Sequence, residues 1–214
     1  LSSWAGLSEL RKARASDIDI SAETCPQYLL LDVSLYDLPG FESAKYVMSP
    51  PLREAEDRKA LLEAIRNREI QTIATDHCSY RFDTQKTIGF HDFSRIPGGI
   101  PGVEHRVPLM YTKLVCEESL PVTDLVQLMA ENPAKMYGMY PRKGALREGS
   151  DADIVVYEKT GSYIIRAADQ TQNLDYTPYE GLKVTGAVRH VLLNGIPVLE
   201  NGLITRTKTG VYVK

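Results

Sequence analysis

The sequence predicts an α/β fold, in which strands alternate with helices and pair in parallel, followed by a smaller module of strands and turns. Three observations lead to this prediction. A helix-spaced apolar stripe lies in residues 54–67, a β-branched strand pattern follows at 70–75, and the composition changes to strands and tight turns from about residue 143. Strands that alternate with helices of about ten or more residues are typical of parallel βαβ units.

The expected N-terminal elements are a helix over residues 7–14 and a strand over residues 18–22. The helix has its leucines on one side and its charged residues on the other, and apolar residues alternate along the strand. A second short strand is expected over residues 46–48, where Pro50 and Pro51 end it because proline cannot donate to a β-ladder. The helix over residues 54–67 then leads into the strand over residues 70–75.

A polar, turn-rich segment over residues 79–103 follows and ends in a run of prolines and glycines. A loop of this length in a compact domain is usually functional or disordered. Helices are expected over residues 103–116 and from about residue 123. In the latter we expect Asn132 to start a new helix with Pro133 in its first turn, and Gly138 to end it.

The C-terminal module is expected to start with a strand after Gly149. Residues 188–193 and 196–199 are predicted to form a hairpin, because the Asn194-Gly195 pair between them suits a type I′ turn. We therefore divide the chain into residues 1–142, the α/β part, and residues 143–214, the β module.

Composition excludes several classes of function. The chain has 214 residues, of which 43% are hydrophobic, so it can bury a substantial core. A net charge of -3 gives no electrostatic argument for nucleic acid or for an anionic membrane, and no apolar run approaches the ~20 residues that cross a bilayer. Three distant cysteines form neither a disulfide framework nor a thiolate zinc pattern, so a cytoplasmic location is expected. The chain begins in mid-pattern without Met, and we expect it to be part of a longer protein.

The main candidate for chemistry is Asp76, which follows the strand over residues 70–75 and precedes His77 and Cys78. A carboxylate at the C-terminal mouth of a buried strand is where α/β enzymes usually place chemistry. The alternative is that Asp76 caps the next turn. We expect His77 and Cys78 to line the pocket, with ordinary packing as the alternative for both. The other histidines, which we interpret as ordinary surface or packing residues, are His91, His105 and His190.

No nucleophile of the serine or cysteine type is evident. Ser49 has neither a base partner nor a Gly-rich elbow in the sequence, so its expected role is through backbone groups that bind a ligand. Cys25 and Cys78 lack a paired His/Asn signature. No His-x-His or His-x-x-x-His pattern is present, so the chain alone has no recognisable multidentate metal site.

Six segments in one order carry a resemblance to a known family. They are Ala22-Glu23-Thr24-Cys25-Pro26-Gln27-Tyr28-Leu29, Lys45-Tyr46-Val47-Met48-Ser49-Pro50-Pro51-Leu52-Arg53, Ala74-Thr75-Asp76-His77-Cys78, Ile100-Pro101-Gly102-Val103-Glu104-His105-Arg106, Asn132-Pro133-Ala134-Lys135 and Gly149-Ser150-Asp151-Ala152-Asp153-Ile154. The chain closely resembles the dihydropyrimidinase and D-hydantoinase family of cyclic amidohydrolases over nearly its whole length. Each segment is weak evidence by itself, whereas the set is specific.

The resemblance implies a (β/α)₈ barrel with a small β-sandwich. Residues 1–142 would be the C-terminal part of the barrel, and residues 143–214 the C-terminal part of the sandwich with its tail. The family's metal centre holds two divalent ions, for which we expect zinc, and Asp76 matches its eighth-strand aspartate. The family's metal centre uses six metal-binding side chains. The five besides the aspartate are absent from this chain, so little or no metal is expected in it alone.

The implied activity is hydrolysis of a cyclic amide, the ring opening of a dihydropyrimidine or a 5-substituted hydantoin. A metal-bound hydroxide is the family's nucleophile, and Asp76 would be a metal ligand and proton shuttle. Ser49 matches the residue whose backbone holds the ring amide, and Gly98 stands where many relatives carry Asn. Pro97 is expected to line the pocket. The chain alone is predicted to be inactive.

Two alternatives stay open. A non-catalytic scaffold, like the collapsin-response mediator proteins, shares the fold, but those relatives do not keep an aspartate at the position of Asp76. A sibling cyclic amidase, such as allantoinase or dihydroorotase, is disfavoured by the segment 100–106. The expected partner is a small cyclic amide, with no nucleic acid and no membrane, and the full-length protein is expected to be a homotetramer or homodimer.

Overall fold

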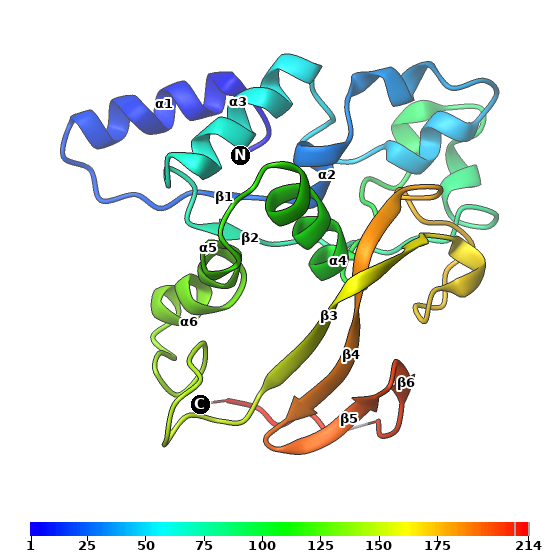
Figure 1. Ribbon diagram of the computed structural model, residues 1–214. Coiled ribbons are helices and arrows are strands. Elements are labelled where there is room, and N and C mark those ends of the chain that lie inside the picture. The colour runs from blue at the N-terminus through cyan, green and yellow to red at the C-terminus, as the bar shows by residue number, and fades with distance from the viewer. Residues whose placement is uncertain (208, 214) are drawn as a thin grey trace. The chain divides into compact units, whose positions relative to one another are not determined.

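The computed structural model describes residues 1–207 and 209–213. In it, a helix precedes each of the two strands that form a parallel pair. Helix α1 (Trp4–Ala15) begins at Ser3, whose side chain accepts a hydrogen bond from the N–H of Gly6, and it buries Leu7 and Leu10. Helix α3 (Ala55–Arg66) buries the stripe that the sequence predicts, and the two helices pack side by side (Figure 1). Both predicted helices are confirmed.

The parallel pairing is confirmed too, although the strands are short. Strand β1 (Glu23–Thr24) pairs with β2 (Thr72–Ile73) in the register Glu23 to Thr72 and Thr24 to Ile73. The strand predicted over residues 18–22 is wrong, because Ile18 and Ile20 are exposed. The guanidinium of Arg14 binds the Ile20 carbonyl oxygen instead of a strand partner.

The strand predicted over residues 46–48 is also wrong. The preceding residues form a 3₁₀ helix, η2 (Glu42–Tyr46), and the carbonyl oxygen of Val47 accepts from the N–H of Gly99 and from the ammonium of Lys86. The other short helical segments of this region are α2 (Pro26–Leu30), η1 (Val33–Asp37), η3 (Lys86–Gly89), η4 (Phe93–Arg95) and η7 (Ala167–Asp169).

The chain forms two compact units, Leu1–Leu109 with Ile164–Leu182, and Met110–Tyr163 with Lys183–Lys214. The first unit contains the parallel strands and all the predicted site residues. The predicted boundary at residue 142 separates the barrel from the β-sandwich of a whole protein, and it stays a prediction.

The second unit begins where α4 (Arg106–Met110) ends. A π-helical segment, η5 (Tyr111–Glu117), is followed by α5 (Val122–Val126), the π-helical η6 (Gln127–Glu131) and α6 (Asn132–Met136). A helix does start at Asn132 with Pro133 in its first turn, as predicted. The predicted N-cap role of Asn132 is wrong, because Asn132 itself has helical dihedrals and follows the preceding helical segment without a break. The stop at Gly138, with φ +68°, is confirmed.

The strands of the second unit form one four-stranded sheet in the order β3-β4-β5-β6. They are β3 (Ile154–Ile164), β4 (Lys183–Leu193), β5 (Ile196–Glu200) and β6 (Leu203–Ile204), and β3 and β4 are the long ribbons of Figure 1. The hairpin is confirmed, since Asn194 and Gly195 have φ of 51° and 76°, as a type I′ turn requires. Within the described residues, no helix is long and apolar enough to cross a membrane.

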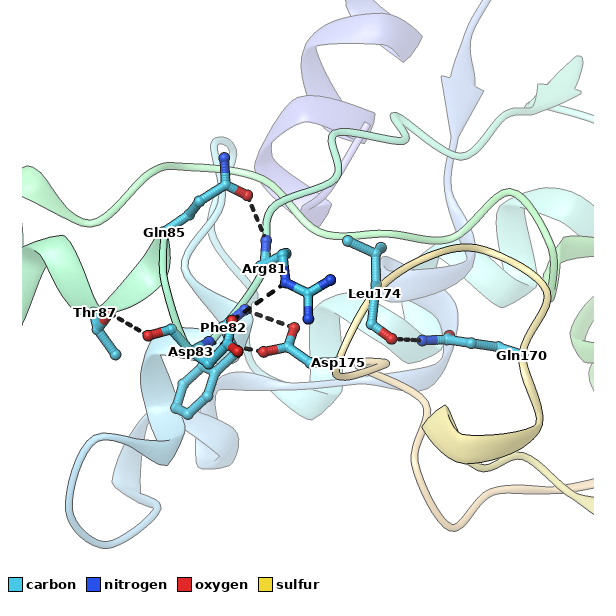
Figure 2. Close-up of polar contacts among 8 residues, drawn as sticks. All are labelled: Arg81, Phe82, Asp83, Gln85, Thr87, Gln170, Leu174 and Asp175. Atoms are coloured by element: carbon cyan, nitrogen blue, oxygen red, sulfur yellow. Dashed lines mark hydrogen bonds and ion pairs between the residues drawn. The ribbon is translucent and has the colours of Figure 1, made fainter.

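Asp175 anchors the long loop over residues 79–103 (Figure 2). Its two carboxylate oxygens accept from the backbone N–H groups of Phe82 and Asp83, each at 2.8 Å. The same turn is closed by Gln85, whose side-chain oxygen accepts from the N–H of Arg81 at 2.7 Å. A contact across about ninety residues of sequence therefore fixes the start of this loop.

Substituting Asp175 with Asn is expected to destabilise the chain by about 1–3 kcal/mol in urea unfolding, because an amide nitrogen would face one of the two donors. Burial raises the pKa of Asp175, but the N–H groups of Asp83 and Phe82 outweigh it, and the net pKa is lowered. The wild-type contribution is therefore present above the ordinary carboxyl pKa and lost as the pH falls through the lowered one. The exposed Asp169→Asn is the matched control; equal effects at both positions would contradict the anchor.

Candidate functional site

Asp76 lies just beyond the C-terminal end of β2. The strand itself is held by burial of Ile73 and Thr72, and the guanidinium of Arg106 donates to the carbonyl oxygen of Ile73 at 3.1 Å. Asp76 is exposed and adopts a left-handed backbone, with φ +49°, which Asp and Asn tolerate better than other non-glycine residues. The chain thus turns sharply at the mouth of the strand and leaves the carboxylate accessible.

A cavity of about 760 Å³ opens beside this carboxylate within the first unit. Its lining is mainly apolar and comes from α1, from the segment around β1 and from the end of β2. The lining residues are Leu1, Gly6, Glu9, Leu10, Ala13, Ile20, Ser21, Ala22, Glu23, Cys25, Tyr28, Pro50, Ala74 and Asp76. The volume is within the range of small-molecule sites.

Three other polar groups of the cavity wall, those of Glu23, Tyr28 and Cys25, are already engaged or neutral. Thr72 donates its hydroxyl to Glu23 at 2.8 Å, and Tyr28 donates its hydroxyl to the carbonyl oxygen of Pro50, also at 2.8 Å. Burial, together with the carboxylates of Glu23 and Asp76, raises the pKa of Cys25 to about 12. A thiol that stays protonated is a poor nucleophile, so Cys25 is a packing residue of the cavity wall.

Ser49 is exposed, and its peptide bond to Pro50 is cis. Pro50 lines the cavity, so the backbone around Ser49 lies at its edge. Gly98 is also exposed, and a Cβ atom added there would meet no atom within 4 Å. A side chain such as Asn could therefore stand at position 98 without a steric penalty.

His77 has a role in the loop structure. Its Nδ1 accepts hydrogen bonds from the N–H groups of Gly102 and Val103, at 3.0 and 3.3 Å, and the residue bridges in parallel to Ile100. The N–H of Cys78 donates to the carbonyl oxygen of Ile100 at 3.1 Å. Both residues join the exit of β2 to the end of the 79–103 loop, and neither is among the residues that line the 760 Å³ cavity.

Lys86 is the residue that sequence reasoning missed. It lies in the polar loop, where a lysine between Gln85 and Thr87 has the pattern of a solvated residue, yet its side chain is fully buried. Its ammonium donates to three carbonyl oxygens, those of Val47, Pro97 and Gly99, at 2.9, 2.7 and 2.8 Å. No local sequence signal predicts this contact, because the acceptors are backbone atoms from two distant segments.

The described residues supply part of a metal site at most. Asp76 is an exposed carboxylate of the type that divalent ions prefer, and its place at the strand mouth suits a ligand. Among residues 1–207 and 209–213, however, no group of three or more His, Cys, Asp or Glu side chains is placed to hold an ion. A metal centre that used Asp76 would need its remaining ligands from outside this part of the chain.

Comparisons with known proteins show what the whole chain is similar to. Residues 32–198 match the family model described as "Amidohydrolase family". A D-hydantoinase of Streptomyces coelicolor is 42% identical over 93% of this chain and 42% of the relative, and one of Geobacillus stearothermophilus is 38% identical over 96% and 44%. The crystal structure of dihydropyrimidinase from Brevibacillus agri superimposes with a TM-score of 0.94 at 38% identity, covering 96% of this chain and 44% of that one.

A more distant structure, an L-hydantoinase (dihydropyrimidinase) from Arthrobacter aurescens, has a TM-score of 0.86 at 30% identity. The chain spans less than half the length of each of these relatives. The predicted fold class, part of a (β/α)₈ barrel with part of a small β domain, is confirmed by these structural neighbours. The match of most of the chain to one family model, together with these relatives, shows that the chain belongs to the amidohydrolase family and is similar to its hydantoinases and dihydropyrimidinases.

Proposed function

We propose that this chain is the C-terminal portion of a cyclic amidohydrolase that opens a dihydropyrimidine or a 5-substituted hydantoin ring by hydrolysis. The observation that carries the proposal is Asp76, an exposed carboxylate at the mouth of β2 on the wall of a mainly apolar cavity of about 760 Å³. The names of the relatives, D-hydantoinase and dihydropyrimidinase, support the substrate class.

Asp76 would take the proton from the attacking water and pass it to the ring nitrogen that leaves. General acid–base catalysis of this kind needs a carboxylate that reaches the reacting atoms, and the sharp turn at φ +49° leaves Asp76 exposed for that purpose. The neutral thiol of Cys25 argues against a covalent intermediate on the cavity wall.

Two divalent metal ions, for which zinc is expected, would supply a water nucleophile at neutral pH and polarise the ring carbonyl. Asp76 is the residue of this chain that would hold one of them, and the other ligands would lie outside the described residues.

Substrate would be held by backbone groups of Ser49, at the edge of the cavity, and of Gly98, which is not among the residues that line it. Pro50 extends the first segment into the cavity wall, and Pro97 precedes the second. His77 and Cys78 would act beside them by fixing the exit of β2. A homodimeric or homotetrameric state and a cytoplasmic location are expected for the full-length protein, and sedimentation would test the first.

The 214-residue chain by itself is expected not to hydrolyse dihydrouracil or a 5-substituted hydantoin when zinc is added, because one carboxylate cannot hold two metal ions against water. The full-length protein that contains it is expected to open at least one of these rings and to lose the activity on chelation. Ring opening can be followed by the loss of ultraviolet absorbance. Turnover by the isolated chain would refute its inactivity, and inactivity of the metal-loaded full-length protein on both rings would refute the function.

A further inference from the structure

Lys86 is a fully buried cation whose hydrogen bonds all go to backbone. An ammonium has three N–H groups, and the described contacts of Lys86 Nζ are with the carbonyl oxygens of Val47, Pro97 and Gly99. The ring of Tyr80 lies 5.7 Å from the same nitrogen. Donors and acceptors are therefore matched one to one.

The three acceptors come from two backbone segments that lie far apart in the sequence. Val47 is two residues before Ser49, and Pro97 and Gly99 flank Gly98 on both sides. The N–H of Gly99 also donates directly to the carbonyl oxygen of Val47 at 3.0 Å. One side chain thus joins the two segments that are proposed to bind the substrate ring.

Joining two loops through a buried charge costs the free energy of desolvating that charge. Burial lowers the pKa of Lys86 to about 8, so the protonated form that has three donors still predominates at neutral pH. An apolar side chain would avoid the desolvation of the ammonium but would leave three carbonyl oxygens without this donor. A charged group with convergent donors sets the relative positions of the three carbonyls, which an apolar contact cannot do.

The backbone of Lys86 is also held in place by a hydrogen bond. The N–H of Lys86 donates to the carbonyl oxygen of Arg81 at 3.0 Å, in the turn that the carboxylate of Asp175 anchors (Figure 2). Fixed contacts therefore run from Asp175 through this turn to Lys86 and on to the two segments.

We propose that Lys86 is a positioning residue, whose buried ammonium sets the spacing between the backbone of Ser49 and that of Gly98 and so the affinity for the cyclic amide ring. Lys86 does not touch the substrate and acts through the segments 47–49 and 97–99. The assignment of those segments to substrate binding rests on the proposed function, whereas the link between them does not.

Hydrogen exchange of the 214-residue chain tests the link without any substrate. Lys86→Met keeps the length of the side chain and removes the donors, and the N–H groups of Gly99 and Cys78 are then expected to exchange at least about tenfold faster, as the loss of one hydrogen bond worth ~1.4 kcal/mol implies. The N–H of Ala74, which donates to Thr24 beside the strand pair, is the internal reference. Equal acceleration of all three amides, or none, would overturn the link.

Steady-state kinetics of the metal-loaded full-length protein test the role in binding. In Lys86→Met, KM for dihydrouracil or a 5-substituted hydantoin is expected to rise about tenfold while kcat per folded molecule changes less. A side chain needed only for stability would lower the fraction of folded protein, which lowers apparent kcat and leaves KM unchanged. The matched control is Lys59→Met, on the exposed face of α3, where side-chain exposure is 75%.

Lys86→Gln is the second variant, because its amide keeps two donors and should fold if the Met variant does not. Its KM is expected to lie between those of wild type and Lys86→Met. An unchanged KM in both folded variants of an active protein would overturn the proposal. If wild type hydrolyses neither ring, the proposed function fails, and the exchange experiment still decides whether Lys86 links the two segments.

Discussion

Substituting Asp76 with Asn is expected to lower kcat/KM of the full-length protein by about 100- to 10,000-fold, the range that loss of a general acid–base group gives. The amide keeps the size of the side chain but can neither take the proton from the water nor bind a divalent ion as a carboxylate does. Initial rates with dihydrouracil and with a 5-substituted hydantoin measure the effect, and thermal unfolding of the same preparation checks the fold.

Asn is the right replacement because of the backbone at position 76. With φ +49° the residue is left-handed, where Asp and Asn are both tolerated, whereas Ala would add strain to the loss of charge. The molecule offers a matched control in Asp17, which is exposed, has φ +59° and lies outside the lining of the 760 Å³ cavity. Asp17→Asn should leave activity unchanged, and an Asp76→Asn protein within about threefold of wild type would refute both proposed roles of Asp76.

The features that the sequence predicts correctly are those that depend on interactions between residues close together in the chain. Helices α1 and α3 and the β4–β5 hairpin depend on local periodicity, a cap or a two-residue turn, and their predicted positions are confirmed. The β-branched run before Asp76 is an equally local signal, so the sequence predicts that Asp76 follows the end of a strand.

The predictions that are wrong concern segments whose backbone partners lie far away in the sequence. The segment around Val47 has a strand-like composition. The carbonyl oxygen of Val47, however, accepts hydrogen bonds from Gly99 and Lys86, which lie about forty or more residues later. Lys86 and Asp175 have ordinary loop contexts, and their importance depends on carbonyl and N–H groups that no local pattern reveals. Tertiary contacts override local preference at such positions.

Substituting Gly99 with Ala is expected to destabilise the chain by about 3–5 kcal/mol, from the sum of backbone strain and overpacking. Gly99 has φ +145°, a conformation that residues with a side chain rarely adopt. Its Cβ atom would lie 2.6 Å from the Cβ and 2.9 Å from the Sγ of Cys78. Urea or thermal unfolding of the 214-residue chain measures the loss.

Gly98 provides the matched control one residue away. A Cβ atom there meets open space, so Gly98→Ala is expected to change stability by no more than about 0.5 kcal/mol. The clash at position 99 can be separated from its backbone strain by a double-mutant cycle with Cys78→Gly, which removes the Cβ and Sγ that the new methyl group meets. The cycle should recover part of the loss and leave the part due to φ. Equal tolerance of Ala at the two glycines would show that Cys78 and Gly99 do not approach each other closely in solution. The proposal that Lys86 sets the spacing of the two segments would then lose the nearest contact that supports it.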